Sequence, residues 1–454
     1  MTDIISGLNG YLWGFPMITF LFFTHIFFTV YTKAIQRKLP CGIRLSLTNP
    51  EGERGGISPF ESLATTLAST LGTGNIMGVG TAVALGGPGA VFWCWVTGVL
   101  GIATQYGEVL LSVKFREKNA SGEYRGGPMY VLRNGVGSKW LSCFYAFVAA
   151  VSVFLTGSVI QSNAIGIVIV DTASGKMKFN ETAVLLITGV IMAILTALVI
   201  FGGLSFVSSL CRVMVPFMGI VYIVGCLVIL YINREVLVSS LLLIVRSAFS
   251  PRSAGGGFVG STILTASRYG VARGLFSNEA GIGTSSIVPA CANTPNPVRQ
   301  ALVSMTATFW DTVVMCLVTG VVIVSSVMAS DNLKEVSDGG ELCALAFSRI
   351  PKAGGGILIF SVVIFAFSTI VGLSCVGVNC AEFLFGKNIR KPYLLLWVVG
   401  VLLAPMIPLD AVWDAADIFN ALLAIPNVCA LFILASTVRK ESKKYLNCPE
   451  KNCA

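Results

Sequence analysis

Charge, histidine and paired cysteines are all scarce in this chain of 454 residues. Charged side chains make up 12% of the sequence, His25 is the single histidine, and the thirteen cysteines include no CxxC pair. A composition so poor in charge excludes an ordinary soluble enzyme. One histidine beside scattered cysteines does not predict a zinc site, and the lack of paired carboxylates argues against a membrane-embedded enzyme.

Two signals of other protein classes are also missing. The formal charge is +9, but the basic residues lie mostly in short connections and form no patch interleaved with aromatic residues, so nucleic-acid binding is not indicated. The stretch from Met1 to Val30 has no basic n-region and no small-residue cleavage site. We therefore expect it to contain a retained first membrane span rather than a removed signal peptide.

Apolar residues and glycine fill the chain instead. Hydrophobic residues make up 55% of it, the mean hydropathy is +0.81, and there are 48 glycines. Runs of about 18 or more apolar residues predict membrane-spanning helices. Eleven spans are predicted, near residues 11–32, 60–83, 89–113, 140–170, 183–203, 209–232, 258–287, 299–328, 354–385, 393–409 and 415–437.

The distribution of Lys and Arg predicts how these spans are oriented. Alternate loops, together with the C-terminal tail, hold 21 of the 31 basic residues, and the loops of the opposite face hold 8. Positive charge accumulates in short cytoplasmic loops. This split predicts a periplasmic N-terminus and a cytoplasmic C-terminus. The connection 233–257 is predicted to form an amphipathic surface helix rather than a twelfth span.

Glycine interrupts two of the predicted spans. Gly72, Gly74 and Gly78 fall with Asn75 in the second span, and glycines, Asn278 and two charged residues interrupt residues 270–283 of the seventh. Each glycine costs a helix about 1 kcal/mol relative to alanine, and unwound backbone at membrane depth is tolerated only inside protein or beside a polar cavity. Both segments are therefore predicted to be broken helices at a binding site.

The spacing of the two breaks predicts an inverted repeat. They lie five spans apart, and setting the first span aside leaves ten, with a broken helix opening each half. We therefore expect a single transporter domain with four parts. Residues 1–58 form an extra N-terminal helix and a cytoplasmic loop, residues 59–232 the first five-helix repeat, residues 258–437 the second, inverted repeat, and residues 438–454 a cytoplasmic tail.

Broken helices of this kind suit a zwitterionic ligand. Free N–H groups at the start of a half-helix carry partial positive charge and bind an anionic group such as a carboxylate. Carbonyl groups freed at the other half-helix end, helped by hydroxyl and amide oxygens, can take Na+ or an ammonium group. A small amino acid fits such a site better than a sugar does.

Several motifs resemble those of the alanine or glycine:cation symporters, also called sodium:alanine symporters. They are the runs GGPGAVFWCWV (86–96), GGPMY (126–130) and RGLFSNEAG (273–281), and the likeness extends from about Ser58 to Glu382. The resemblance implies the leucine-transporter type of fold, an all-α membrane protein with an inverted five-plus-five helix repeat and one extra N-terminal helix. It also implies cation-coupled uptake of alanine, glycine or a similar small neutral amino acid, D-alanine and serine included.

The coupling ion expected from the resemblance is Na+, with H+ left open as the alternative. A channel is less favoured, since no filter motif or acidic ring is present. We expect a bacterial inner-membrane, multi-pass protein that acts as a monomer in the lipid bilayer.

Candidate substrate residues follow from the breaks and from the resemblance. We expect backbone N–H groups of Gly72, Thr73 and Gly74 to bind the substrate carboxylate, and the Asn75 amide oxygen to face the substrate or an ion. The resemblance places a further set near the substrate, with Phe276 as a lid; close packing of helices is the alternative for several of them. This further set comprises Gln161, Phe276, Ser277, Thr369 and Leu373.

Candidate ion ligands lie on three spans. Ser368 and Thr369 match the hydroxyl pair that faces the first broken helix in this fold, and Thr70 and Asn75 lie at the first break itself. Asp311 is a carboxylate at membrane depth, which costs about 2.5–3.5 kcal/mol unless it is paired. It is expected either to pair with Arg268 or Arg273 or to bind a cation. Glu108 and Glu279 are ambiguous in the same way, with more weight on structural pairing.

The sequence departs from the family pattern at several positions. Leu373 stands where the family usually has tryptophan, which predicts a wider side-chain pocket and tolerance of serine or threonine. Cys94 replaces a usual methionine, and Gln105 replaces a usual lysine.

Overall fold

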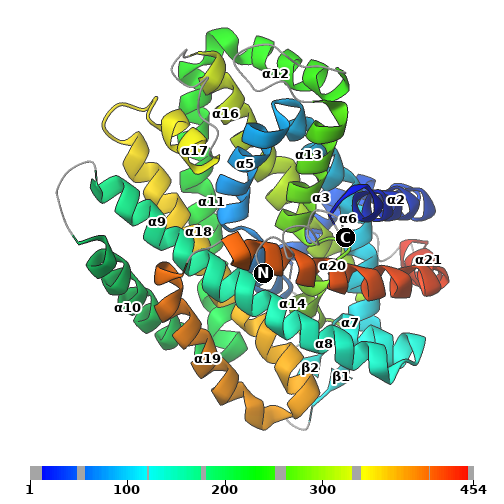
Figure 1. The fold of residues 1–454 in the computed structure, drawn as a ribbon. Helices are drawn as coiled ribbons and strands as arrows, with labels where there is room; N and C mark the ends of the chain where they lie inside the picture. The colour runs from blue at the N-terminus through cyan, green and yellow to red at the C-terminus, as the bar shows by residue number, and fades with distance from the viewer. Residues whose placement is uncertain are drawn as a thin grey trace.

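The computed structural model describes residues 13–48, 57–119, 122–174, 180–250, 262–329, 339–407 and 410–447. Apart from the two-residue strands β1 (Glu117–Lys118) and β2 (Tyr124–Arg125), which pair antiparallel, the regular structure of these residues is helical (Figure 1).

Eight of the predicted spans are helices that are long and apolar enough to cross a membrane, counted within the described part of the chain. Two of them contain a π-helical segment, and one is flanked by short 3-10 turns. The helices are α6 (Gly89–Lys114), α8–η4–α9 (Lys139–Val153, Phe154–Ile160, Gln161–Ser174), α10 (Glu181–Ile200), α11 (Gly203–Ile232), α15–η6–α16 (Pro297–Thr308, Phe309–Cys316, Leu317–Met328), α18 (Gly354–Phe385), η8–α19–η9 (Lys387–Ile389, Arg390–Leu403, Ala404–Met406) and α20 (Asp410–Ile433).

The first predicted span is α2 (Phe15–Tyr31), and it continues into a bent partner. The chain turns by 64° and forms η1 (Ile35–Lys38) and α3 (Leu39–Ser46). Helix α3 packs against α15 and α4. The predicted loop after span one is therefore largely helical.

The second predicted span is broken where its glycines lie. Helix α4 (Pro59–Thr70) starts at a capping box between Ser58 and Glu61 and ends where Leu71 and Gly72 become extended. A 3-10 turn, η2 (Thr73–Asn75), separates it from α5 (Met77–Gly86).

The seventh predicted span is also broken, but the break begins later than the sequence suggested. Helix α13 (Ile263–Asn278) runs through Phe276, and the Asn278 side chain then accepts a hydrogen bond from the N–H of Ala280 at 2.9 Å. Glu279, Gly281 and Gly283 follow with φ of 55°, 95° and 94°, a region that glycine adopts freely and that stops the helix. The chain resumes as η5 (Thr284–Ser286) and α14 (Ile287–Ala290). Residues 258–261 of the predicted span lie outside the described residues.

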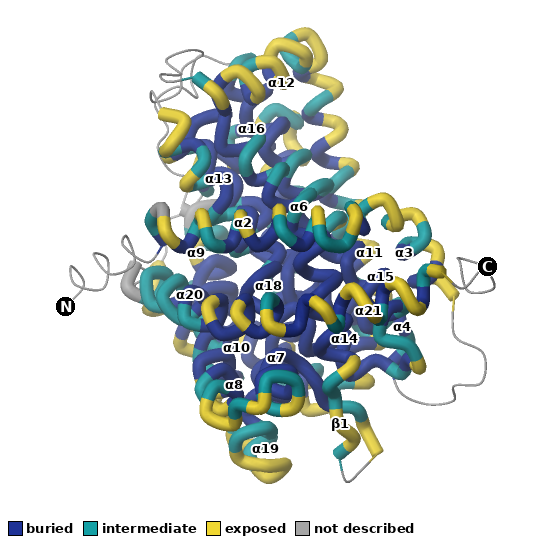
Figure 2. The backbone as a smooth tube through the Cα atoms, turned by 90° about the vertical axis from the view of Figure 1, so that its right-hand side faces the viewer, coloured by how far each residue is buried: buried dark blue, intermediate teal, exposed yellow. Residues whose placement is uncertain are grey.

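Corresponding helices of the two predicted halves pack on one another. Helix α6 lies against α15, α8 against α18 and α10 against α19. Helix α6 lies at the centre of the bundle and α10, α11 and α19 lie at its perimeter. Of the most apolar 18-residue stretch in each helix, 83% is buried in α6 and 33% in each of the other three. Figure 2 shows buried residues through the middle of the molecule and exposed ones on peripheral elements such as α12 and α19.

Smaller elements close the two ends of the bundle (Figure 1). Helix α12 (Arg234–Phe249) forms where a surface helix was predicted, with buried serines on one face and exposed apolar residues on the other. The β1–β2 hairpin, α7 (Pro128–Tyr130) and η3 (Val131–Val136) lie at the opposite end, where Asn293, beyond α14, donates its N–H to the carbonyl of Ile57 at 3.0 Å. The two remaining helices are α17 (Gly339–Phe347) and α21 (Ala435–Leu446).

Candidate functional site

The two breaks meet in the interior of the bundle. Asn75 of the first break donates its Nδ2 to the Ser277 hydroxyl, close to the second break, at 2.8 Å. The approach to α18 is equally tight, because a Cβ on Gly72 would lie 2.7 Å from the Thr369 Oγ1. Gly72 thus allows backbone and side chain to come closer than any larger residue would permit.

A small polar cavity of about 30 Å³ lies between the breaks. One water needs about 10–15 Å³ of such space, so the cavity has room for only a few waters. Eight of the predicted site residues line it: Thr70, Gly72, Gly74, Gln161, Phe276, Ser277, Thr369 and Leu373. Ser69, Thr156, Glu279 and Asn420 complete the lining.

Two backbone N–H groups of the first break are already bonded to amide side chains. The Asn75 Oδ1 accepts from the Gly72 N–H at 3.0 Å. The Gln161 Oε1 accepts from the Thr73 N–H at 3.2 Å and from the Thr73 hydroxyl at 3.1 Å. Gln161 is held in turn by a bond from its Nε2 to the Thr156 carbonyl, five residues back, across the π-helical segment η4. A carboxylate entering this site would compete with amide oxygens for these donors.

Hydroxyl and carbonyl oxygens converge where α18 faces the end of α4. The Ser368 hydroxyl lies 2.8 Å from the Phe365 carbonyl oxygen and 3.4 Å from those of Ala68 and Leu71. The Thr369 hydroxyl lies 3.0 Å from the Leu71 carbonyl oxygen and 3.1 Å from that of Phe365. These five oxygens, which we call the hydroxyl–carbonyl cluster, are uncharged, buried and suited to a monovalent cation.

Thr70, predicted as an ion ligand, lies elsewhere. Its hydroxyl donates to the Thr66 carbonyl, four residues back, at 3.2 Å, and its side chain lines the polar cavity. The hydrogen bond to its own turn is the ordinary alternative for a helical threonine.

Asp311 forms a second polar cluster on η6. It is fully buried, and its carboxylate accepts from Asn75 at 2.8 Å, from Ser277 at 2.7 Å and from Thr312 at 2.6 Å. Among the residues that the structure describes, no lysine or arginine forms an ion pair with it.

The expected pairing of Asp311 with Arg268 or Arg273 is therefore wrong. Arg268 lies over the ring of Tyr269, and Arg273 lies over the rings of Phe276 and Trp413. Both arginines stack on aromatic rings, which attract cations, and this leaves the carboxylate with neutral donors only.

Two further carboxylates brace the second break. Glu108 of α6 accepts from the Gly281 N–H at 2.8 Å and from the Asn427 side chain at 2.6 Å. Glu279 accepts from the Thr284 hydroxyl at 2.5 Å. These bonds hold the unwound turn, although the Glu108 Oε2 has no hydrogen-bond partner among the described residues. The bonds favour a structural role for both residues.

Gln105, which replaces a usual lysine, also bonds to this region. Its Oε1 accepts from the Ser285 hydroxyl of η5 at 2.9 Å. Its place is therefore beside the inner half of the second broken helix.

Phe276 lies between the cavity and the ring of Trp413. The two ring centroids are 5.6 Å apart, and the Phe276 ring is 3.5 Å from where a Cβ on Gly74 would lie. The ring thus covers the first break from one side, as a lid would.

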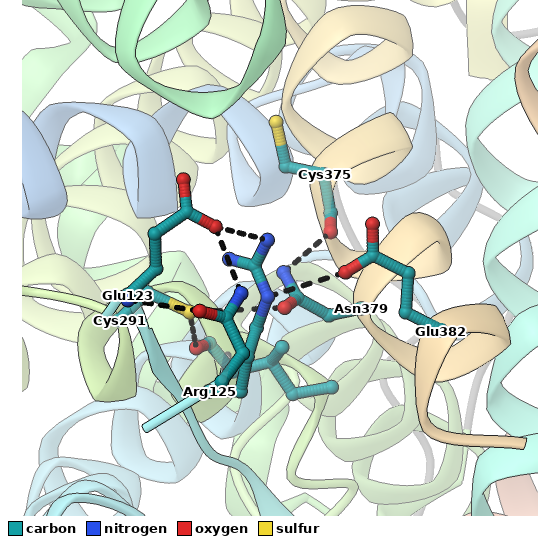
Figure 3. Close-up of polar contacts among 8 residues, drawn as sticks. Glu123, Arg125, Cys291, Cys375, Asn379 and Glu382 are labelled. Atoms are coloured by element: carbon teal, nitrogen blue, oxygen red, sulfur yellow. Dashed lines mark hydrogen bonds and ion pairs between the residues drawn. The ribbon is translucent and has the colours of Figure 1, made fainter. Parts of the chain in front are cut away.

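Arginines of the β1–β2 region tie the inner half-helix α14 to α18. Arg116 donates to the carbonyls of Ala290, Ala292 and Thr294 at 3.2, 2.7 and 2.7 Å, where α14 ends. Figure 3 shows Arg125 between Glu123 and Glu382, with distances of 3.0 and 3.2 Å. We call this pair of contacts the cytoplasmic latch, after the side that the charge distribution predicts.

Arg125 stays charged in this setting. Burial lowers the pKa of its guanidinium, but the neighbouring Cys291, Glu382 and Glu123 raise that pKa above its ordinary value. The side chains of Arg125 and Glu382 are only 10% and 11% exposed, so the ion pair is largely shielded from water.

Sequence reasoning missed several residues of the cavity and its surroundings. Asn420 and Thr156 are polar side chains inside predicted spans, which is a usable signal of function. The carbonyl groups of Ala68, Leu71 and Phe365 leave no mark on residue identity, because every residue carries one.

The chain is similar to known proteins along almost its whole length. The sequence pattern described as the Sodium:alanine symporter family matches residues 1–453. An uncharacterized transporter of Haemophilus influenzae is 40% identical over 447 residues, covering 98% of this chain and 96% of that protein. The sodium/alanine symporter AgcS of Methanococcus maripaludis is 38% identical over 451 residues, covering 98% and 97%.

The fold is matched by a solved structure as well. MhsT, crystallised with L-phenylalanine, superposes with a TM-score of 0.63 at 15% identity, covering 86% of this chain and 93% of that one. The predicted leucine-transporter type of fold is thereby confirmed.

Proposed function

This chain belongs to the sodium:alanine symporter family, and we propose that it couples inward flow of Na+ to uptake of a small neutral amino acid such as alanine or glycine. Members of the family are transporters rather than enzymes, and the chain is a multi-pass membrane protein. The observation that carries the proposal is the polar cavity of about 30 Å³ between two broken helices, with the hydroxyl–carbonyl cluster beside it.

The amide side chains at the first break occupy the N–H donors that the substrate carboxylate would use. A substrate carboxylate takes the N–H groups of Gly72 and Thr73 from the oxygens of Asn75 and Gln161, which already bond to them. Exchanging a neutral acceptor for a charged one at a half-helix start strengthens the interaction. The substrate side chain then points toward Leu373 and Phe276, and the small cavity suits glycine, L-alanine or D-alanine better than larger residues.

The coupling ion binds the hydroxyl–carbonyl cluster in this proposal. Ser368 and Thr369 belong to α18, while the Leu71 carbonyl belongs to the end of α4, so an ion there holds the first break against α18. Ion and substrate then favour each other's binding by equal factors, because both bind the same ordered state of the break.

Proton coupling is the alternative, and Asp311 is the residue that would carry it. Asp311 is a buried carboxylate whose donors among the described residues are neutral, so either a proton or a second Na+ would neutralise it. We propose a bacterial inner-membrane location, a periplasmic N-terminus, a cytoplasmic C-terminus and a monomeric carrier. A channel is disfavoured, since the cavity is small.

Uptake into proteoliposomes tests the function. Purified protein should accumulate labelled alanine when a Na+ gradient is imposed, and should not do so with an equal proton gradient alone. Accumulation driven only by protons would overturn Na+ coupling. Failure of alanine, glycine, serine and D-alanine to compete would overturn the substrate class.

Thr369→Ala tests the ion site in the same assay. Removal of one oxygen ligand should raise the Na+ concentration for half-maximal uptake about ten-fold, equivalent to about 1.4 kcal/mol. Ser361→Ala on the same helix is the matched control, because the Ser361 hydroxyl bonds only to its own turn, at the Ile357 carbonyl. Thr369→Ser should restore Na+ affinity. Unchanged Na+ dependence in Thr369→Ala would show that the ion binds elsewhere.

A further inference from the structure

A second, much larger cavity lies on the outside of the bundle, away from the polar cavity. It is a groove of about 510 Å³ with an almost entirely apolar lining. Leu63 and Leu67 of α4 form one wall, Ile220 and Val224 of α11 form the other, and Trp310 and Met315 of η6 form the floor. The volume falls within the range of about 300–1,000 Å³ typical of small-molecule sites.

The groove opens toward the hydrocarbon of the bilayer. Ile220 and Val224 are 64% and 53% exposed, and Phe217 beside them is 53% exposed, on a helix long enough to cross the membrane. Water has no polar partner in such a groove, whereas apolar chains lose nothing by entering it and gain contacts along both walls. The chemistry of the walls therefore selects a hydrocarbon chain.

Two arginines lie close in sequence to residues that line the groove. Arg212, just before the groove-lining part of α11, lies 3.4 Å from Glu61 at the start of α4 and keeps 55% of its side chain exposed. Arg44 is exposed on α3, next to Ile43, which lines the groove. Positive charge at the predicted cytoplasmic surface attracts anionic lipid headgroups.

We propose that the groove binds a phospholipid with an anionic headgroup, one acyl chain lying between α4 and α11 and the phosphate facing Arg212 and Arg44. The proposal extends the transport function proposed above to a regulatory ligand. A ligand of this kind matches both the apolar walls and the two arginines next to the groove.

Leu71 connects the groove with the proposed ion site. The Leu71 side chain lines the groove, and its carbonyl oxygen on the other side is the one that Thr369 contacts at 3.0 Å. The floor residues Trp310 and Met315 flank the segment that carries Asp311. A chain in the groove packs behind the first break and stabilises the arrangement of α4 in which the ion cluster is assembled.

Fluorescence quenching of Trp310 tests the binding directly. Trp310 is 39% exposed, and its signal is obtained as the difference between the wild type and Trp310→Phe. In vesicles of phosphatidylcholine, added phosphatidylglycerol with brominated chains should quench Trp310 saturably. We expect about a five-fold preference over brominated phosphatidylcholine, the factor that one arginine near the surface supplies.

Gly219→Leu is the blocking variant. Gly219 lines the groove, and a Cβ there would meet no atom within 4 Å, so leucine should fill the groove without a clash and with a gain in helix propensity. Gly355→Leu is the matched control, because Gly355 also has open space but lies at the start of α18 outside the groove. Quenching by the anionic lipid should fall to the phosphatidylcholine level in Gly219→Leu and persist in Gly355→Leu.

Three outcomes would overturn the proposal. One is equal quenching by both lipids, which indicates ordinary boundary lipid. The second is unchanged quenching in Gly219→Leu. The third is an absence of Trp310 quenching by either lipid together with the formation of cross-linked dimers, which indicates that a second copy covers the groove.

Transport provides a separate readout. Initial uptake should rise with phosphatidylglycerol content in the wild type and in Gly355→Leu, but not in Gly219→Leu, and equal rises in all three would contradict the regulatory part. If the protein transported no amino acid, the proposed function would fail, while the quenching result would still decide the lipid site.

Discussion

Asp311 carries a buried carboxylate with no ion pair among the described residues. Its three donors are neutral: Asn75 lies in the first break, Ser277 near the end of α13, and Thr312 in η6 itself. A charged group at membrane depth costs about 2.5–3.5 kcal/mol unless it is compensated. Three hydrogen bonds offset part of that cost, and a cation or a proton in the transport cycle would supply the rest.

Asp311→Asn should therefore alter coupling. If Asp311 takes a proton, the substitution should abolish the pH dependence of uptake. If it binds a second Na+, the substitution should lower the apparent Na+ affinity by at least about ten-fold, equivalent to about 1.4 kcal/mol. The measurement is uptake against Na+ concentration at two external pH values. Glu108→Gln is the comparison, because Glu108 braces the second break and should change protein yield more than ion dependence. Identical Na+ and pH profiles in Asp311→Asn and wild type would contradict an ion role.

Leu373 should set the upper size of the substrate. It lines the polar cavity, and its Cβ lies 2.8 Å from where a Cβ on Gly157 would stand, so the wall there is already close-packed. Leu373→Trp should leave competition by glycine and alanine nearly intact and remove competition by serine and threonine, as a panel of unlabelled amino acids would reveal. If the wild type excludes everything larger than alanine, leucine does not widen the pocket.

Among single residues, the sequence predicted those with distinctive side-chain chemistry and missed those that reach the cavity only through the packing of distant helices. Gly72 stands out because glycine breaks a membrane span, Gln161 and Thr369 were predicted through the family resemblance, and the structure brings all three to one cavity. Asn420 comes from the last span, and its approach to the first break depends on how distant helices pack. Residue identity alone does not determine such packing.

Among the elements, both breaks were predicted, but the second was placed too early. Glycine composition around Gly270 and Gly274 suggested unwinding there, yet both residues lie inside α13, where they allow close packing on α6. A Cβ on Gly270 would lie 2.4 Å from the Ala90 carbonyl oxygen. Glycine thus served helix packing at these two positions and chain reversal at Gly281 and Gly283, and composition does not separate the two uses.

The cytoplasmic latch should control inward opening. Glu382→Gln leaves Arg125 with the exposed Glu123 as its remaining ion-pair partner, and breaking a buried pair costs about 3–5 kcal/mol. The cysteines nearby, Cys291 and Cys375, are each 7% exposed. Their labelling by a thiol reagent, read residue by residue by mass spectrometry, should become faster by at least about ten-fold.

Glu117→Gln provides the control for the latch. It breaks the more exposed pair of Glu117 with Arg133, a kind of contact worth about 0–1 kcal/mol. Labelling of Cys291 and Cys375 should then stay near the wild-type rate. Equal labelling rates in both variants would mean that the Arg125–Glu382 pair does not hold this end closed.

For the whole molecule, hydropathy predicted the spans because the bilayer fixes their length. Eight of the eleven predicted spans are single helices long and apolar enough to cross a membrane in the described residues, and the other three are α2, the broken α4–α5 and the broken α13–α14. Helix α12, predicted as a surface helix, is not among the eight. The pairing of α6 with α15 and of α8 with α18 could not be read from hydropathy. It depends on which small residues face each other, and it was not among the predictions from the sequence.

The orientation of the whole chain is directly testable. The excess of Lys and Arg in alternate loops predicts a periplasmic N-terminus and a cytoplasmic C-terminus. An epitope at the N-terminus of the full chain should be cut by protease in intact spheroplasts, and one at the C-terminus should be cut only after lysis. The reverse pattern would invert the proposed direction of uptake.

The hydrogen bond from the Asn293 N–H to the Ile57 carbonyl oxygen has a consequence for movement. It joins the residues that follow α14 to the residues just before α4, so neither half-helix can move away alone without losing this bond. We therefore expect α14 and α4 to move together when the carrier opens, and ion and amino acid to be released in the same step.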